Sequence, residues 1–323
     1  MKLFEFEKYF PNEESCKAKF KEIREKQGVV CSKCGSINHY WLPSKQQFRC
    51  KHCQHFTTLR AGTVMHGSKL PFRYWFIAMH LLTSTKHTFS ATEIQNQLGH
   101  KRYQPIWEMV HKLRSVMGKR DEKYMLHGEV EVDEGFFTTE IPANEKEDKL
   151  KAGAGSQKKT KVLVMAESTK IIPEKKEGQK EKKGEKEKRV GYIKMVVIPN
   201  LKAATIDGEV VNAIDSKAEI TSDATKSHCN FNKMFSKVDA QVVEPENIGK
   251  VLPWVHIAIA NSKSLFIDTY HGVKREFLQE YLNEFCYKFN RRYFGEGLFD
   301  RLVMISATYR TGFEHRLYNK NVA

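Results

Sequence analysis

Apolar residues recur at helical spacing through much of the first 120 residues. Residues 1–28 mix apolar and aromatic side chains with Lys and Glu, and residues 71–82 (PFRYWFIAMHLL) form a strongly apolar stretch that Pro71 can begin. A further helical stretch follows at about residues 105–117. The pattern predicts a mainly helical first part of the chain, interrupted at residues 29–58 by short β-like runs.

Two of these helices are predicted to flank a tight turn. Ser90 and Glu93 have the spacing of a capping box at the start of SATEIQNQLG, and Gly99 can end that helix. The outline is that of a helix-turn-helix motif, although any small helical bundle shares it. If the motif binds DNA, the basic side chains near the turn would contact it: Lys101, Arg102 and Lys112.

The periodicity changes to that of β-strands from Gly128 onwards. The predicted strands are EVEVD (129–133), KVLVMA (161–166), GYIKMVVI (191–198) and AEITSD (218–223). Helical spacing returns from about Trp254 and again over residues 274–289. Strands with helices around them predict a mixed α/β domain over residues 125–300.

The formal net charge of +15 and the pI near 9.3 point to a polyanionic partner such as DNA. Part of this excess lies in a lysine-rich segment at residues 170–190, whose run KKEGQKEKKGEKEKR has no apolar residue and predicts a disordered insertion. The sequence contains no run of 18 apolar residues, so no membrane span is expected, and the N-terminus lacks the apolar core of a signal peptide. We therefore expect a cytoplasmic protein.

Four of the seven cysteines form two C-x-x-C pairs, Cys31 with Cys34 and Cys50 with Cys53, separated by 15 residues. Four thiolates suit tetrahedral Zn²⁺, and this spacing is typical of a zinc ribbon rather than of redox-active pairs. A closed four-cysteine site predicts a structural zinc. Basic residues around it offer a surface for DNA, or simply a solvated face: Lys33, Arg49 and Lys51.

Two aspartates end predicted strands and are candidates for a cation site. In EVEVD the valines should face the core, which places Glu129, Glu131 and Asp133 on the opposite face. Asp223 ends the strand AEITSD. Carboxylate oxygens are the ligands that Mg²⁺ and Mn²⁺ prefer, although such residues can also be solvent-exposed or cap a turn.

The segments TYHGV (269–273) and YLNEFCYKFNRR (281–292) complete an ordered set with the ribbon, the EVDE strand and the S-D strand end. Together these resemble the zinc-ribbon insertion-sequence transposases, whose catalytic domain is of the acidic-triad, RNase-H-like kind. The resemblance implies an α+β multi-domain protein with a mixed catalytic sheet. It also implies transposon-end and target DNA as partners, a homodimer or higher oligomer on DNA, and a bacterial, nucleoid-associated location.

Site residues follow from the resemblance. Asp133 and Asp223 would be the first two triad members, and the third should lie two helical turns before Lys263. His256 stands at that place instead of the usual Glu, and Asn261 is the other candidate. The resemblance implies Mg²⁺ or Mn²⁺ at these residues, and Lys263, Arg291 and Arg292 along the phosphate backbone.

The resulting scheme has four parts: an N-terminal helix and zinc ribbon (1–62), a helical DNA-binding segment (63–124), an RNase-H-like catalytic domain (125–300) and a C-terminal tail (301–323). The expected function is DNA cleavage and strand transfer. Other functions remain open: a zinc-ribbon DNA-binding regulator, a nuclease or resolvase that cuts without joining, and a catalytically decayed transposase copy.

Overall fold

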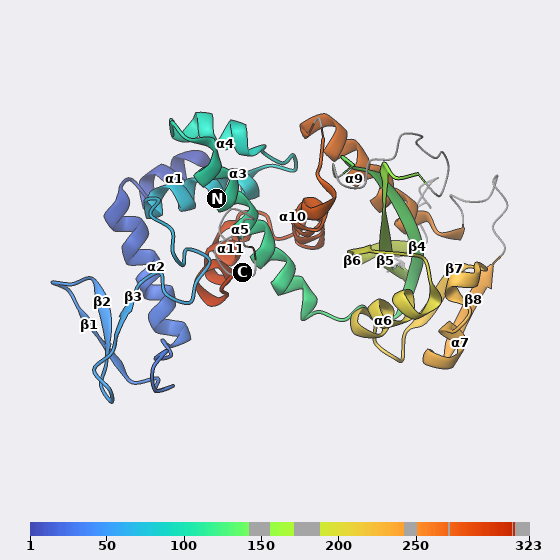
Figure 1. The fold of residues 1–323 in the computed structure, drawn as a ribbon, viewed down its shortest axis with the longest axis horizontal. Helices are drawn as coiled ribbons and strands as arrows, with labels where there is room; N and C mark the ends of the chain where they lie inside the picture. The colour runs from blue at the N-terminus through green and yellow to red at the C-terminus, as the bar shows by residue number, and fades with distance from the viewer. Residues whose placement is uncertain (142–155, 171–187, 242–250, 271, 312, 314–323) are drawn as a thin grey trace, which may run out of the picture. The chain divides into compact units, whose positions relative to one another are not determined.

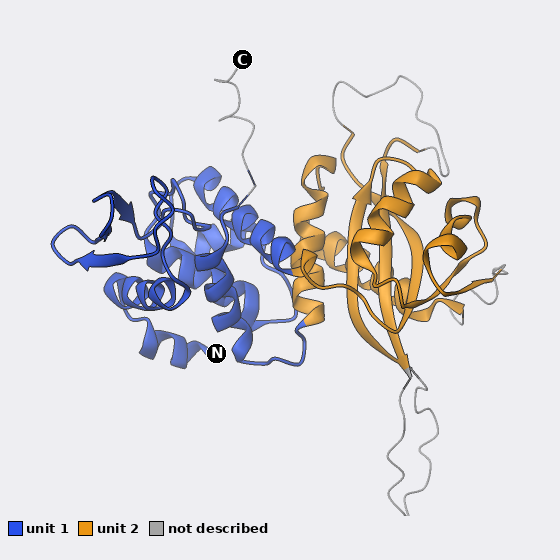
Figure 2. Cartoon of the chain, turned by 90° about the horizontal axis from the view of Figure 1, so that it is seen from below, with its two compact units in different colours: residues 1–120, 291–323 blue, residues 121–290 orange. Residues whose placement is uncertain are grey.

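The chain folds into two compact units, residues 1–120 with 291–323 (unit 1) and residues 121–290 (unit 2), as Figure 2 shows. The computed structural model describes residues 1–141, 156–170, 188–241, 251–270, 272–311 and 313. A zinc-ribbon segment, helices and a mixed sheet confirm the predicted α+β multi-domain fold. The predicted lysine-rich insertion lies outside the described residues except at its two ends, which belong to strands β5 and β6.

Unit 1 is mainly helical. Its helices are α1 (Leu3–Tyr9), α2 (Glu13–Gln27), α3 (Phe72–Ser84), α4 (Ala91–Leu98), α5 (Tyr103–Glu122, which continues two residues past the unit) and α11 (Gly297–Thr308). The predicted capping box is present at α4, where Glu93 N–H donates to Ser90 Oγ and Ser90 N–H donates to the Glu93 carboxylate. Gly99 ends α4 in the left-handed conformation. Helices α4 and α5 therefore flank a short turn, as predicted.

Helix α11 packs within unit 1 although the sequence scheme divided its residues between the catalytic domain and a tail. Phe299 lies against the rings of Phe6 and Phe10, with centroids 5.8 and 5.7 Å away. The Val64 N–H donates to Ser306 O, and Arg24 donates to Ala307 O. The apolar face of α11 is thus buried against the N-terminal helices, so residues that follow unit 2 in the sequence help to form unit 1.

The cysteine-containing part of unit 1 is a small antiparallel sheet in the order β1 (His39–Leu42), β2 (Gln47–Cys50), β3 (Phe56–Thr58). Trp41 and Phe48 face each other across β1 and β2, with ring centroids 4.8 Å apart. Strand β2 carries Cys50 at its end, so the sheet positions one of the two cysteine pairs.

Unit 2 is built on a five-stranded sheet in the order β6-β5-β4-β7-β8 (Figure 1). The strands are β4 (Glu129–Thr138), β5 (Lys159–Lys170), β6 (Lys188–Ile198), β7 (Glu219–Asp223) and β8 (Lys237–Gln241). Strands β4, β5 and β6 are antiparallel neighbours, whereas β4, β7 and β8 run parallel. This is the mixed RNase-H-like sheet that the sequence predicts.

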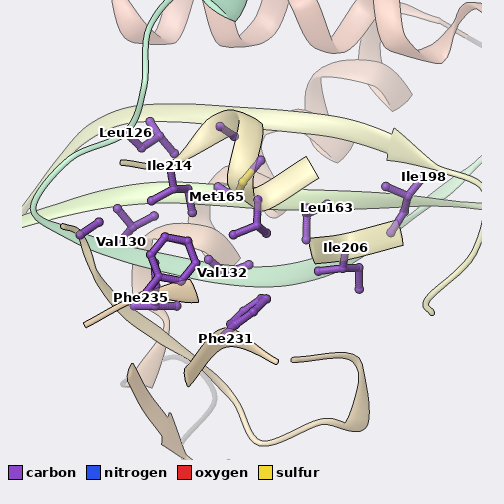
Figure 3. Close-up of a cluster of buried hydrophobic side chains, with 14 residues drawn as sticks. Leu126, Val130, Val132, Leu163, Met165, Ile198, Ile206, Ile214, Phe231 and Phe235 are labelled. Carbon is purple, nitrogen blue, oxygen red and sulfur yellow. The ribbon is translucent and has the colours of Figure 1, made fainter. Parts of the chain in front are cut away.

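Helices cover both faces of this sheet. They are α6 (Ala203–Ala213), α7 (Phe231–Met234), α9 (Pro253–Thr269) and α10 (Leu278–Asn290), with 3₁₀ turns η3 (Lys226–His228) and η5 (Arg275–Phe277). On one face, Val130 and Val132 of β4 share a core with residues of α6 and α7, and Figure 3 shows Phe231 and Phe235 turned toward them. On the other face, α9 and α10 pack against β5 and β6. Neither face of β4 is therefore a free solvent face.

Candidate active site and zinc ribbon

The four cysteines of the two C-x-x-C pairs converge, and their sulfur atoms all lie within 4.8 Å of one another. Cys31 Sγ lies 3.5 Å from Cys53 Sγ, and Cys34 Sγ lies 3.6 Å from Cys50 Sγ. Sulfurs bound tetrahedrally at about 2.3 Å from Zn²⁺ are about 3.8 Å apart, so the arrangement fits zinc. Such a site would hold the ribbon together and leaves no ligand position for a substrate.

The two cysteine turns have the same backbone form but different sequences. After the second cysteine of each pair, the chain enters the left-handed region at Gly35 (φ 70°) and at Gln54 (φ 60°). Gly35 N–H then donates to Cys31 O, and Gln54 N–H donates to Cys50 O. Backbone N–H groups of Cys53 and His52, acting against burial, lower the pKa of Cys50 to about 6. They therefore favour the thiolate that zinc requires.

Asp133 and Asp223 lie beside each other at the sheet. The parallel pairing of β4 and β7 aligns Glu131 with Thr221 and Val132 with Ser222, so Asp133 and Asp223 are the next residues of adjacent strands. Burial raises the pKa of Asp133 to about 6, and the nearby charge of Asp223 adds to that rise, against the N–H bond from Glu134. The structure thus brings together the two aspartates that the sequence singles out.

Helix α9 runs along the face of β4 that carries Glu131 and Asp133. Glu131 is 3% exposed and its Oε2 accepts the N–H groups of Trp254 and Val255, so it caps the first turn of α9. The Glu131 carboxylate is therefore already hydrogen-bonded to the backbone of α9. Of Glu131 and Asp133, Asp133 is thus the one that remains for a cation.

Further contacts between strand β4 and helix α9 follow one another along both elements. A strand advances about 6.8 Å in two residues and a helix about 6.0 Å in four, so alternate strand residues meet successive turns of α9. His256 Nδ1 lies 3.8 Å from Asp133 Oδ2, and Lys263 Nζ lies 5.6 Å from the ring centroid of Phe137. Burial lowers the pKa of both His256 and Lys263. Asn261 is exposed.

A second cluster lies next to the two aspartates. His228, on η3 after β7, has Nδ1 2.9 Å from Asp223 Oδ1 and Nε2 3.2 Å from Glu134 Oε1. Burial would lower the pKa of His228, but the two carboxylates raise it to about 10. The contact with His228 outweighs burial at Asp223 and holds the pKa of that carboxyl below its ordinary value. Glu134, Asp223 and His228 form a group with metal-ligand spacing.

Glu134 and His228 are the site residues that sequence reasoning missed. Glu134 directly follows Asp133 in EVDE, and His228 follows Asp223 by five residues in SDATKSH. An acidic residue after a strand end and a histidine in the next turn are weak signals, because both residue types are common on loops. Their meeting depends on the pairing of β4 with β7.

The basic residues predicted to contact DNA differ in exposure. Lys33, Lys51, Lys101 and Arg102 are exposed, whereas Arg49, Lys112 and Arg292 are half-buried. Arg49 lies over the Phe56 ring and Arg292 over the Tyr293 ring, at 5.3 and 4.5 Å from the centroids. Arg291 is 6% exposed, which does not favour a direct phosphate contact.

A divalent cation fits Asp133 and Asp223, which follow the last β4–β7 pair. Two carboxylates provide the hard oxygen ligands that Mg²⁺ and Mn²⁺ select. Burial raises the pKa of Asp133, which means that its charged form lacks sufficient compensation in the protein alone. A bound cation supplies that compensation. The donor set does not distinguish Mg²⁺ from Mn²⁺.

Comparison with known families decides the identity of the chain. The model of the ISXO2-like transposase domain matches residues 125–290, and that of the transposase zinc-ribbon domain matches residues 11–56. The chain belongs to the ISXO2-like transposase family. The resemblance inferred from the sequence is thereby confirmed, and the family supports DNA as the partner of this transposase.

Comparisons with individual proteins add little to this. The transposase matches a chain of the "Crystal structure of the Mos1 Strand Transfer Complex" with 14% identity, over 77% of this chain and 82% of that one, with a TM-score of 0.28. That score is too low to align site residues. A search among curated proteins found no match. No helix in the described part of the transposase is long and apolar enough to cross a membrane.

Proposed function

We propose that this transposase catalyses metal-dependent cleavage of transposon-end DNA and its transfer to a target strand, with Asp133 and Asp223 as the ion-binding carboxylates. The observation that carries the proposal is their placement on adjacent parallel strands, each as the residue after the last β4–β7 pair. When bound there, a pair of divalent ions would activate a water or a DNA 3′-hydroxyl for in-line attack on phosphorus.

The protein side chains hold and orient the reacting groups. Asp133 and Asp223 would hold the divalent ions. Lys263, on the same helix face as His256, is a cation for the DNA phosphate. Glu131 fixes the start of α9 and through it the place of His256 beside Asp133.

The third ligand position falls to His256 rather than Asn261. His256 lies 3.8 Å from Asp133, whereas Asn261 is exposed on α9. An imidazole is a poorer ligand for Mg²⁺ than a carboxylate and suits Mn²⁺ better. We therefore expect weak cleavage in Mg²⁺ and stronger cleavage in Mn²⁺. Lower activity of His256→Glu in Mg²⁺ would count against this assignment.

DNA binding is assigned to the exposed basic residues of unit 1: Lys33, Lys51, Lys101 and Arg102. Phosphate contacts release counterions, so affinity should fall steeply with salt. Three further basic residues are half-buried and should contribute less to DNA binding: Arg49, Lys112 and Arg292. Arg291 is buried and should make no direct contact with DNA. Joining needs two DNA ends, so the proposal includes a dimer or higher oligomer on DNA.

The test is cleavage and joining of a labelled transposon end, taken from the flanks of the gene, in Mg²⁺ and in Mn²⁺. Asp133→Ala and Asp223→Ala are the controls. Joining that both substitutions abolish supports the transfer reaction and its two aspartates. Cutting without joining supports a nuclease or resolvase. Salt-dependent DNA binding without cutting in either ion supports a regulator or a decayed copy and contradicts the proposal.

A further inference from the structure

We propose that Glu134 and His228 form a positioning pair that holds the Asp223 carboxylate in place for its ion, an inference that rests on the proposed function. Neither residue has been assigned a role in the reaction above. Glu134 lies within β4, directly after Asp133, and His228 lies in the turn that follows Asp223. The pair would act through Asp223 without touching DNA.

The His228 side chain is enclosed and oriented on all sides. It is 2% exposed, and its ring is stacked on Phe231, with centroids 4.7 Å apart and planes 18° apart. Nδ1 lies 2.9 Å from Asp223 Oδ1, and Nε2 lies 3.2 Å from Glu134 Oε1. The stacking and the two carboxylates together restrict the orientation of the ring, and the contact of Nε2 with Glu134 is an ion pair without hydrogen-bond geometry.

The turn after β7 wraps the same carboxylate oxygen. Thr225 Oγ1 donates to Asp223 Oδ1 at 3.1 Å and lies 3.4 Å from His228 Nδ1. His228 N–H donates to Thr225 O, which closes the turn. His228 Nδ1 and Thr225 Oγ1 both contact Oδ1, so Oδ2 is the oxygen that these two contacts leave for an ion.

The pair also links the two catalytic strands. Glu134 N–H donates to Asp133 Oδ1 at 2.7 Å, and its side chain, 8% exposed, reaches His228. Asp133 and Asp223 are thus joined through Glu134 and His228. Partners of metal-binding carboxylates that fix their orientation commonly change metal affinity by about 10- to 100-fold when replaced.

Direct ligation by His228 is the competing role. The ligand atoms of His228, Asp223 and Glu134 all lie within 4.8 Å of one another, so spacing alone also suits an ion among them. The two ring nitrogens of His228, however, each lie beside a different carboxylate. Each nitrogen is also within ion-pair distance of an oxygen already. This geometry favours a bridge between carboxylates over a ligand.

The experiment measures Mn²⁺ binding to the full-length, zinc-loaded protein by calorimetry, with a thermal unfolding scan of each variant. We expect His228→Leu and Glu134→Gln to weaken Mn²⁺ binding by about 10- to 100-fold. His228→Gln keeps an amide that can donate to Asp223, so it should retain more affinity than His228→Leu. Val210→Ala, in the same apolar cluster but on helix α6, is the matched control, because it should lower the unfolding temperature and leave the Mn²⁺ affinity of the folded protein within about twofold.

Two further measurements decide between the outcomes. Asp223→Ala must weaken Mn²⁺ binding; if it does not, both the proposed function and the positioning pair are wrong. If it does while folded His228→Leu binds Mn²⁺ as wild type does, the positioning pair alone is wrong. The His256→Asn variant removes the other candidate histidine ligand. If its Mn²⁺ electron paramagnetic resonance spectrum still shows a directly bound nitrogen, His228 is a ligand and the proposal is overturned.

Discussion

Proton binding competes with ion binding at Asp133. Burial raises its pKa from the ordinary 3.8 to about 6, and burial lowers that of the neighbouring His256. At neutral pH the carboxylate is therefore charged and the imidazole is neutral, which is the state that can bind a divalent cation. The folded protein binds the Asp133 proton more tightly than the unfolded chain does, so the competition begins as pH falls toward 6.

This predicts that Mn²⁺ affinity is full at pH 7 and falls below pH 6, by about tenfold for each pH unit. Calorimetric titration at pH 5, 6 and 7 measures it. His256→Asn separates the two groups, because a fall that persists in this variant belongs to Asp133. An affinity that stays level between pH 5 and 7 would show that Asp133 is not a ligand.

At the scale of elements, the start of α9 depends on a side chain from the sheet. Glu131 accepts two backbone N–H groups of the first turn, and it does so while buried. A negative charge at this end of a helix is favourable, and the N–H groups left without it would be buried.

We predict that Glu131→Ala lowers the free energy of unfolding by about 1–3 kcal/mol, measured by urea denaturation. Asp268→Asn, at the exposed C-terminal end of the same helix, is the control. It removes a charge from the unfavourable end and should leave stability unchanged or slightly higher. Equal losses from the two variants would contradict the capping role.

A β-bulge in β5 also depends on a buried carboxylate. The register between β5 and β6 shifts at Ala166 and Ser168, and Glu167 turns inward to accept Tyr124 O–H, His127 N–H and Tyr192 N–H. A methyl group at Gly191 would lie 2.8 Å from Glu167 Cβ, which leaves no room for it.

Gly191→Ala should therefore lower the free energy of unfolding by about 1–3 kcal/mol. Gly208→Ala is the matched control, since its added methyl meets nothing within 4 Å inside helix α6. That change should raise stability by about 0.5–1 kcal/mol. Thermal unfolding of both variants tests the contrast, and a neutral Gly191→Ala would show that the bulge can rearrange.

The elements differ in how far the sequence predicts them. Alternating valines and the capping box of α4 are local signals, and the corresponding strand and helix form as expected. Strand β8, KVDAQ, alternates only Val238 and Ala240 with polar residues, too short a pattern to predict a strand, and it gains its place by pairing with β7. Asp223 ends its strand as predicted, but β4 runs past Asp133 to Thr138, and Glu134 meets His228 only in the assembled sheet, which no local pattern contains.

At the scale of the whole molecule, the two units use different means of stabilisation. The ribbon of unit 1 has three strands of three or four residues, too small to bury a core of its own. Unit 2 has two apolar clusters, one on each face of its sheet. Loss of zinc should therefore destabilise the ribbon of unit 1 and leave the fold of unit 2 unchanged.

Removing zinc with a chelator should expose the amides of residues 39–58 to hydrogen exchange and leave those of residues 160–166 protected. Mass spectrometry of the exchanged peptides measures both regions in one experiment. Cys34→Ser should reproduce the loss at the ribbon, while Cys286→Ser, a buried cysteine of unit 2, should not. Loss of protection in both regions would mean that the units unfold together.

The matched advance of α9 and β4 has a consequence for how this part of the protein can change in evolution. Substitution at His256 or Lys263 alters one contact and leaves the other in place. Loss or gain of a single residue between them turns everything beyond it by about 100° and moves Lys263 off the strand. Relatives can therefore carry different residues at these two positions, but the number of residues between the two positions should stay the same.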